Sequence, residues 1–384
     1  MTHASTSQNI VVQAVQDKPA LEQFIDLPYQ LHQADPHFVP PLRISEWEKF
    51  DPKKNPFYEH ARVELFVALR GEQVVGRVAA IDDDHHNATH NDNLLFFGFF
   101  EAGDEAVATA LMQTVEARAQ ELGRSAVRGP ANPSMNDGSG FQIDAFDTDP
   151  FIMMPFNPAS YPSYVESLGY SKIKDLYAWY FDIQKPDVGG RIARIAARAK
   201  KRYDVTIRDV NMSNFEAELG LLKHIYSEAW EKNWGFVKYT DQEFDHLAAE
   251  LKLILDPKMA LFIESAGEVA GVCVCLPNVN EVFKRIPNGR LLPRGILYLL
   301  GMKLRRKWFI QSVRLPILGV LPKFRNKGFE AILIDHIVTC GYNQGYSFGE
   351  LSWILEDNHS INQAIKATGA TIYKTYRLYE KALS

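Results

Sequence analysis

The sequence predicts a mixed α/β (α+β) fold made of two tandem domains, each a mixed, mostly antiparallel sheet flanked by helices. Three observations lead to this prediction. The chain has 384 residues, more than a single hydrophobic core usually organises. Hydrophobic residues make up 46% and charged residues 23%, the composition of an ordinary globular protein. Two pairs of similar segments also recur in the same order at nearly one spacing, which indicates an internal duplication.

The repeat consists of a hairpin pattern and a later strand pattern. Residues 65–76 and 261–271 begin 196 positions apart (261 − 65), and in both of them apolar stretches rich in Val, Ile and Phe flank a Gly-Glu turn. Residues 169–180 and 369–379 begin 200 positions apart (369 − 169). The matching order predicts duplication of a unit of about 190 residues.

The predicted boundary lies at a segment with Pro and Gly in the middle of the chain. Residues 184–190 have linker composition, and a basic, helical segment follows as far as Arg202. We therefore expect a degenerate domain over residues 1–183, a linker and basic helix over 184–203, and a second domain over 204–384. The cations of the basic helix are expected either to face solvent or to attract a phosphorylated ligand.

The pattern of apolar residues predicts an order of elements that repeats in both halves. In the first half, residues 94–100 are expected to form a strand and residues 104–123 the helix after it. Antiparallel hairpins followed by a β-α-β unit predict one mixed sheet with helices on its faces. The second half is expected to contain strand 204–210, a mostly helical stretch 214–255, hairpin 261–276, strand 314–320, helix 329–345, strand 349–355, helix 360–368 and strand 371–379.

Composition argues against several classes of protein. The net charge of −5 gives no basic field for phosphate contact, so no DNA partner is expected. The three cysteines, Cys273, Cys275 and Cys340, lack a second pair for a zinc site or a disulfide framework and are expected to be reduced. Residues 82–90 hold acids and three histidines without regular ligand spacing, so no metal site is expected. The sequence shows neither a secretory signal nor a transmembrane segment, which predicts a cytoplasmic protein.

Residues 320–333 follow an apolar strand and open a helix. This arrangement directs a series of backbone N–H groups to a helix N-terminus, which is anion-binding geometry. Gly328 would let the backbone approach a pyrophosphate closely, and Arg325 and Lys327 add positive charge. An ordinary strand-to-helix loop with solvated charges is the alternative.

The same segment resembles the acetyl-CoA pyrophosphate loop of the GNAT family of N-acyltransferases, V-x-P-x-x-R-x-x-G-x-G/A. Val320, Pro322, Arg325 and Gly328 match this pattern, whereas Glu330 stands where Gly or Ala is usual. The resemblance implies two tandem GNAT-like domains and acetyl-CoA, or another acyl-CoA, as co-substrate. The cofactor-binding residues that it implies are Val320, Leu321, Arg325, Asn326, Lys327, Gly328, Phe329, Glu330 and Asn358.

Asn358 belongs to a second motif of this resemblance. It ends residues 353–358 and is followed eleven positions later by Gly369, the N-x(10)-G spacing of the family. In GNAT enzymes the two strands splay apart here, the pantetheine arm pairs with strand backbone, and the asparagine helps to hold the gap. Asn358 could also cap the following helix. The tyrosine that often protonates the leaving thiolate falls at Ile365 in this chain.

Acyl transfer to an amine requires a base near the splayed strands. Alternation along the strand places Glu350, Ser352, Ile354 and Glu356 on one face, so Glu356 and Glu350 are the candidate bases. A surface position is the alternative for either carboxylate. The missing acid could be replaced from the last strand by Tyr373, Tyr376 or Tyr379, of which Tyr376 is the catalytic candidate; a core position is the alternative for each.

The first half lacks the phosphate loop, because Glu101-Ala-Gly-Asp104 joins its strand to its helix. We expect this half to bind no CoA and to act as a structural partner. Its long loop carries Asn132, Asn136 and Asn157, which either face a ligand or satisfy turns. Large bacterial GNAT-like proteins of unassigned substrate are similar in this loop and in residues 352–358.

Residues 289–308 form a further amphipathic pattern with a basic end. This insert could line an acceptor site, attract an acidic or acylated substrate, rest on anionic lipid, or pack against its domain.

Taken together, the motifs of the sequence predict an N-acyltransferase that moves an acetyl or other acyl group to a small-molecule or peptide amine. Two alternatives stay open, a Fem-type aminoacyl transferase using aminoacyl-tRNA and a non-catalytic CoA- or ligand-binding protein, and a homodimer is also left open.

Overall fold

The computed structural model describes residues 9–183 and 190–383. It divides into two compact units, which we describe separately. Unit 1 contains the described residues of Met1–Asp175 and Tyr376–Ser384, and unit 2 contains those of Leu176–Thr375.

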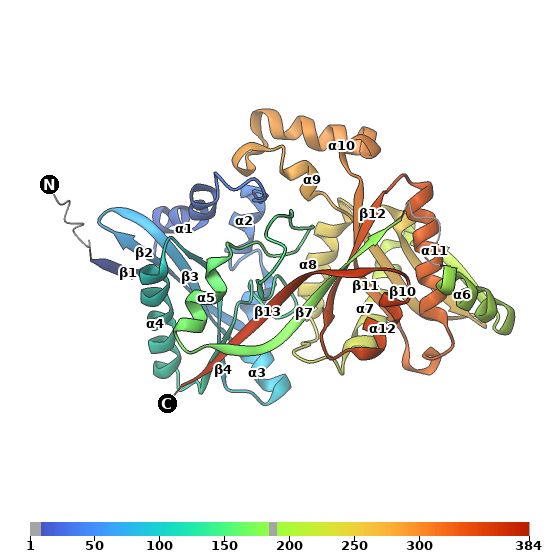
Figure 1. Cartoon of the computed structure of the whole chain (residues 1–384), viewed down its shortest axis with the longest axis horizontal. Coiled ribbons are helices and arrows are strands. Elements are labelled where there is room, and N and C mark those ends of the chain that lie inside the picture. Colours follow the sequence, from blue (N-terminus) through green and yellow to red (C-terminus); the bar gives the residue numbers. More distant parts are fainter. Residues whose placement is uncertain (1–8, 184–189, 384) are drawn as a thin grey trace. The chain divides into compact units, whose positions relative to one another are not determined.

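Unit 1 is a mixed sheet covered by helices (Figure 1). All neighbouring strands are antiparallel except β4 and β5, which are parallel. In sheet order the strands are β1 (Ile10–Ala14), β2 (Ala61–Arg70), β3 (Gln73–Asp83), β4 (Leu94–Ala102), β5 (Ala126–Gly129) and the end of β13 (Thr371–Ala382), with β6 (Phe141–Gln142) also on β13. The helices are α1 (Lys18–Leu31), α2 (Arg43–Lys49), α3 (Asp84–His90), α4 (Glu105–Glu121) and α5 (Ser160–Ser167).

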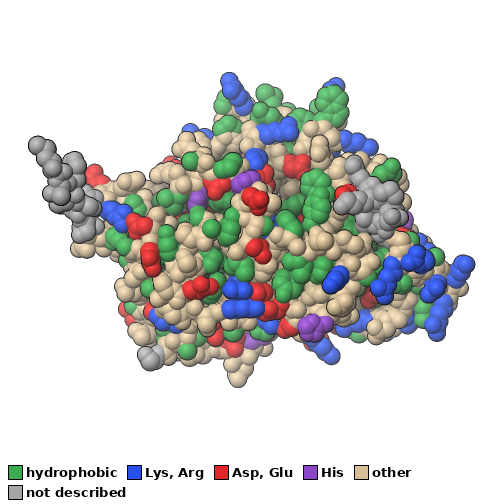
Figure 2. Space-filling view, viewed as in Figure 1, with side chains coloured by type: hydrophobic (Ala, Val, Ile, Leu, Met, Phe, Trp, Pro, Cys, Tyr) green, Lys and Arg blue, Asp and Glu red, His purple; other side chains and the backbone are tan. Residues whose placement is uncertain are grey.

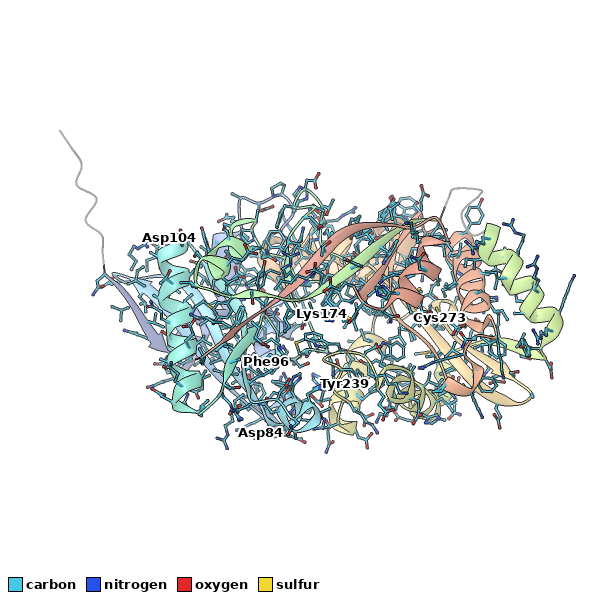
Figure 3. The ribbon with its side chains drawn as sticks, turned by 60° about the horizontal axis from the view of Figure 1, so that its bottom comes forward. Asp84, Phe96, Asp104, Lys174, Tyr239 and Cys273 are labelled. Carbon is cyan, nitrogen blue, oxygen red and sulfur yellow. The ribbon has the colours of Figure 1, made fainter. Side chains whose placement is uncertain are left out.

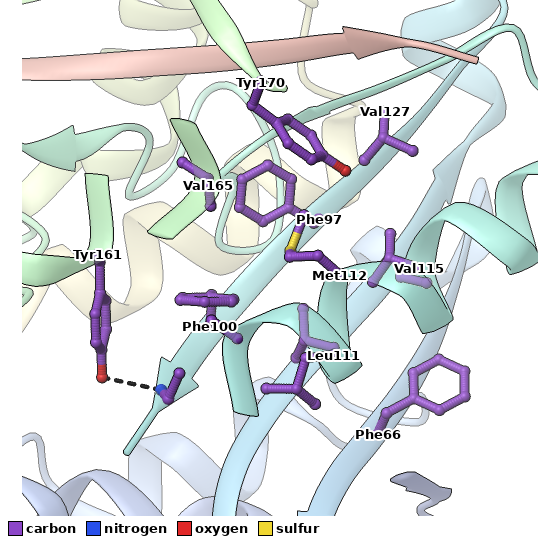
Figure 4. Close-up of a cluster of buried hydrophobic side chains, with 14 of the residues drawn as sticks. Phe66, Phe97, Phe100, Leu111, Met112, Val115, Val127, Tyr161, Val165 and Tyr170 are labelled. Atoms are coloured by element: carbon purple, nitrogen blue, oxygen red, sulfur yellow. Dashed lines mark hydrogen bonds between the residues drawn. The ribbon is translucent and has the colours of Figure 1, made fainter. Parts of the chain in front are cut away.

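Alternation along the strands builds a core on each face of this sheet. Phe66 packs with α4 and α5, whereas the next residue, Val67, packs with α1. Figure 4 shows the α4 side, where Tyr161 accepts a hydrogen bond from the Ala102 N–H at the end of β4. The Tyr161 hydroxyl also donates to Glu101 at 2.8 Å, so this buried phenol is satisfied on both sides.

Unit 2 repeats this plan. Its sheet is antiparallel except for the parallel pair β11 and β12. In sheet order the strands are the end of β7 (Ser171–Asp182), β12 (Phe348–Leu355), β11 (Ser312–Val320), β10 (Glu268–Pro277), β9 (Ala260–Ser265) and β8 (Val205–Asp209). The helices are α6 (Gly190–Arg202), α7 (Phe215–Trp230), α8 (Asp241–Lys252), α9 (Asn280–Phe283), α10 (Ile296–Phe309), α11 (Phe329–Asn343) and α12 (His359–Lys366).

Helices cover both faces of this second sheet. Leu318 of β11 packs with α11 and α6, whereas Gly319, the next residue, lies against Trp230 of α7. The mixed α/β prediction is therefore confirmed, including both hairpins and the β-α-β order after them.

The strands β7 and β13 each extend from one compact unit into the other, so the units are not two consecutive halves of the chain. Residues 176–182 of β7 pair with β12 in unit 2, and residues 376–382 of β13 pair with β5 and β6 in unit 1. The compact units therefore do not follow the predicted limits of 1–183 and 204–384. Residues 184–189 of the predicted linker lie outside the described residues, and the basic segment after them forms α6 as predicted.

Candidate active site in unit 2

The predicted phosphate loop joins β11 to α11. After Val320 the chain makes one turn of 3₁₀-helix, and Asn326 and Gly328 then adopt left-handed φ angles of 62° and 81°. Such alternating conformations direct successive N–H groups to one side, and the first N–H groups of α11 have no acceptor within the helix. A Cβ at Gly328 would lie 3.2 Å from the Ala199 Cβ of α6, so this position requires glycine for both its conformation and its space. This is the backbone conformation expected of the predicted anion-binding loop.

The charged side chains of this loop are placed differently from the prediction. Arg325 donates to the backbone carbonyls of Val320 at 3.4 Å and Ala229 at 3.1 Å, and so ties the loop to β11 and α7. The Lys327 ammonium lies over the rings of Phe324 and Tyr203. These two cations therefore contact backbone carbonyls and aromatic rings of the protein itself.

Glu330 is the departure from the family pattern. Burial raises the pKa of its carboxyl, and neither a hydrogen bond with its own backbone N–H nor the nearby Arg325 offsets this effect. Glu330 lies in the first turn of α11, where an anionic ligand would also bind.

The strands β11 and β12 diverge next to this loop. Their parallel pairing runs from Ser312 with Phe348 to Leu315 with Leu351 and then ends. Past Leu315, β11 pairs only with β10 among the described strands, and the end of β12 pairs with β7. The splayed geometry that the resemblance implied is present.

Asn362 of α12 binds the end of β12. The Asn362 side chain donates to the Leu355 carbonyl at 2.9 Å and accepts from the Trp179 ring N–H at 3.1 Å. Asn358 caps α12, since its side chain accepts from the Ile361 N–H at 3.4 Å. The sequence pattern drew attention to Asn358 and missed Asn362.

A buried polar network lies where the two strands begin to separate. Arg314 Nε donates to Ser352 Oγ at 2.8 Å, and Ser352 Oγ donates to Glu350 Oε1 at 2.5 Å. The Tyr373 hydroxyl donates to the other oxygen, Glu350 Oε2. Glu350 is fully buried and Arg314 is 4% exposed, so their charges at 3.8 Å compensate each other away from water.

The other predicted catalytic residues lie outside this network. Glu356 lies half-buried in the turn after β12, whose pairing with β7 carries an irregularity between Leu351 and Ile354. The predicted uninterrupted alternation from Glu350 to Glu356 is therefore wrong, because one extra residue shifts the register. Tyr376 belongs to unit 1, where it is fully buried and pairs with Gln142.

An apolar cavity adjoins Glu350 on the side of the sheet that α11 covers. Its enclosed volume is about 40 Å³. Most of its lining is aliphatic, from β11, β12 and α11, including Val313, Leu315, Ile334, Ile337 and Val338. A carboxylate at the edge of an apolar space is an arrangement suited to an apolar substrate with one polar end.

The equivalent divergence in unit 1 is filled by the chain itself. The strands β4 and β5 separate after Phe96, and the Ala131 N–H then donates to the Phe97 carbonyl at 2.9 Å. The side chain of Asn132 accepts from the Phe99 N–H, and a Cβ at Gly98 would lie 1.7 Å from the Ala131 oxygen. The loop after β5 therefore fills the space that a ligand would need.

The helix that follows β4, α4, is capped at its N-terminus by the Asp104 carboxylate. Asp104, at the start of α4 in Figure 3, accepts from the Val107 N–H at 3.0 Å and from Arg70 at 2.8 Å. Burial alone would raise the pKa of Asp104, but these hydrogen bonds lower it below its ordinary value. An aspartate that caps this helix terminus and has a lowered pKa makes the terminus unsuited to phosphate.

The asparagines of the unit 1 loop serve its backbone. Asn157 accepts from the Gln142 N–H at 2.7 Å and donates to the Gln142 carbonyl at 3.1 Å. With Asn132 pairing to Phe99, two of the three candidate ligand-facing asparagines satisfy backbone groups instead.

The described residues form neither a metal cluster nor a membrane-spanning helix. Within residues 9–183 and 190–383, no three His, Cys, Asp or Glu side chains converge as metal ligands. None of the described helices combines the length and the apolar character that crossing a bilayer requires.

Two proteins of related sequence align with the whole chain. "Bacterial ceramide synthase" of Caulobacter vibrioides is 37% identical over 392 residues, spanning 100% of both chains. "Protein YghO" of Escherichia coli is 33% identical over 388 residues, spanning 100% of this chain and 98% of the relative. No protein-family model matches the chain.

Solved structures share the fold at low sequence identity. A tandem GNAT protein from the clavulanic acid biosynthesis pathway superposes with a TM-score of 0.54 and 10% identity over 97% of this chain and 98% of its own. A GCN5-related N-acetyltransferase from Sphaerobacter thermophilus gives 0.54 and 12% identity over 97% and 95%. These comparisons show that the chain has the fold of tandem GNAT proteins. The chain belongs to the family of the bacterial ceramide synthase.

Proposed function

We propose that the protein is an N-acyltransferase that moves a fatty acyl group from acyl-CoA to the primary amine of a long-chain sphingoid base, forming a ceramide-type amide. The observation that carries this proposal is the splayed pair β11 and β12, which ends at an anion-binding loop and adjoins an apolar cavity. The name of the 37% identical relative supports the acceptor class. The proposed reaction takes place in the cytoplasm, where acyl-CoA would be supplied.

The donor is held by backbone groups. The N–H groups of residues 326–330 bind the pyrophosphate, and the edge of β11 past Leu315 pairs with the pantetheine arm. Exposed cations of α6, among them Arg194, Arg198 and Lys201, add a positive field beside the loop.

Glu350 and Tyr373 move the proton in this proposal. The neutral amine forms the C–N bond as the C–S bond breaks, and the nitrogen proton passes to the Tyr373 hydroxyl, whose own proton passes to Glu350. The leaving thiolate then takes that proton back through the same hydroxyl. Arg314 and Ser352 hold the Glu350 carboxylate in position and are positioning residues.

The substrate class is tested by pairing two donors with two acceptors. Purified protein receives palmitoyl-CoA or acetyl-CoA with sphinganine or a short hydrophilic amine, and mass spectrometry measures the N-acyl product. We expect product from palmitoyl-CoA and sphinganine, with a preference of at least about tenfold over each other pair. Faster acetylation of the hydrophilic amine would contradict the proposal. Product formed only with aminoacyl-tRNA would indicate the Fem-type reaction, and CoA binding without transfer would indicate a binding protein.

Replacing Glu330 with alanine is expected to tighten acyl-CoA binding by about twofold to fivefold, because it removes a carboxyl from the phosphate site. In the wild type, phosphate beside this carboxyl favours its protonated form, so affinity should rise as pH falls through the elevated pKa. Isothermal titration across acidic pH measures both effects. Glu72→Ala, in the exposed turn between β2 and β3 of unit 1, is the control. Unchanged affinity and pH dependence in Glu330→Ala would place the phosphates elsewhere.

A further inference from the structure

The segment between β10 and β11 exposes apolar side chains. We call residues 284–309, which include α10, the α10 segment. Of the thirteen large apolar side chains that are exposed in the described part of the chain, six belong to this segment. They are Leu292 (75%), Ile296 (43%), Leu297 (65%), Leu300 (51%), Leu304 (82%) and Trp308 (73%). No residue of α10 is buried.

The same segment is strongly basic. Between Val282 and Trp308 the sequence has eight Lys or Arg and no Asp or Glu, although the whole chain carries a net charge of −5. Figure 2 shows basic and apolar side chains together at the upper edge, where Figure 1 places α10. The exposed cations are Lys284, Arg285, Arg290, Arg294, Lys303, Arg305 and Lys307.

The base of the segment is fixed to the body of unit 2. Arg306 pairs with Asp256, donates to Gln344 at 3.1 Å, and lies 5.0 Å from the ring centre of Tyr346. A Cβ at Gly295 would lie 2.7 Å from the Arg290 oxygen, so the turn before α10 is also closely packed. The segment is thus held in place while its apolar side chains point outward.

We propose that the α10 segment docks unit 2 on the surface of an anionic phospholipid bilayer. The apolar side chains would enter the boundary between headgroups and acyl chains, and the cations around them would meet lipid phosphates. A protein partner fits less well, because Lys is depleted from protein interfaces and charge from their cores, whereas here cations are interleaved with the apolar residues. Docking would bring the active site to its substrates, because a long-chain amine and a fatty acyl donor both partition into membranes. This benefit to catalysis rests on the proposed function.

Vesicle sedimentation of the full chain tests docking without any substrate. We expect binding to vesicles of phosphatidylcholine with phosphatidylglycerol to exceed binding to phosphatidylcholine alone by about tenfold and to weaken with salt. The triple variant Leu297→Ser, Leu304→Ser and Trp308→Ser should lose about tenfold of this binding. Leu253→Ser, which changes a side chain 84% exposed outside the segment, is the matched control.

Two results would overturn the proposal. One is equal binding of the wild type to both vesicle types, and the other is a triple variant that binds like Leu253→Ser. Circular dichroism of each variant is the control for an intact fold, which we expect because the substituted side chains are exposed.

Measuring acyl transfer by the wild type and the triple variant distinguishes the docking proposal from the proposed function. If both hold, the triple variant turns over short-chain, monomeric substrates at the wild-type rate and loses activity with sphinganine presented in anionic vesicles. Vesicle binding without any acyl transfer would contradict the proposed function and leave docking intact. Wild-type activity of the triple variant on vesicle-borne sphinganine would contradict the role of docking alone.

Discussion

Replacing Tyr373 with phenylalanine is expected to lower kcat for acyl transfer by about 10²–10⁴-fold while leaving the Kd for acyl-CoA unchanged. The substitution removes the hydroxyl that donates to Glu350 and leaves the ring in place. Glu350→Gln should produce a loss of similar size, and the double variant should lose little more, because the two groups act as one relay. Product formation under saturating donor, together with titration of acyl-CoA, measures the two quantities.

Tyr342→Phe is the matched control, because this side chain is 63% exposed on α11. Its kcat should equal that of the wild type. Glu356→Gln discriminates between the two predicted bases. If Glu356→Gln were inactive and Glu350→Gln active, the base would be the carboxylate in the turn after β12 and the proposed relay would be wrong.

Replacing Arg314 with methionine is expected to lower the free energy of unfolding by about 3–5 kcal/mol. The guanidinium is 4% exposed and lies beside a fully buried carboxylate, which the variant would leave without its compensating charge. Denaturant unfolding measures the change. Adding Glu350→Gln to Arg314→Met should restore part of the stability, because it removes the uncompensated charge.

Arg198→Met changes an exposed arginine of α6 and should shift the unfolding free energy by less than about 0.5 kcal/mol. A similarly small effect of Arg314→Met would show that water reaches the network around Glu350 and that the strands open there. Equal stability of Arg314→Met and the double variant would show that the two charges are not coupled.

Local patterns were sufficient to predict the elements of unit 2. The hairpin at β9 and β10, the helix that begins near Gly328 and the strand that ends before Asn358 all lie within a few residues of their predicted limits. Each depends on residues close together in the chain, such as Ala266 and Gly267, which join β9 to β10.

The exchange of the late strands could not be predicted in the same way. Residues 171–182 and 371–382 have similar sequences and both form strands, so alternation alone cannot decide which sheet receives each of them. The same limit applies to Tyr373 and Tyr376. They are three positions apart, yet Tyr373 contacts Glu350 in unit 2 and Tyr376 packs in unit 1.

Arg314 was missed for a related reason. It stands in the apolar strand Ser312–Val320, where its charge is unusual, and that was the one available signal. Its partners Ser352 and Glu350 lie on another strand and become neighbours only through the parallel pairing of β11 with β12.

Hydrogen exchange with and without palmitoyl-CoA tests most directly whether unit 2 alone binds the donor between its splayed strands. We predict slower exchange at residues 316–331 and 352–355 when the ligand is present, and unchanged exchange at residues 97–107 of unit 1, where the chain fills its own gap. Protection of residues 97–107, or no protection at the loop before α11, would contradict this account.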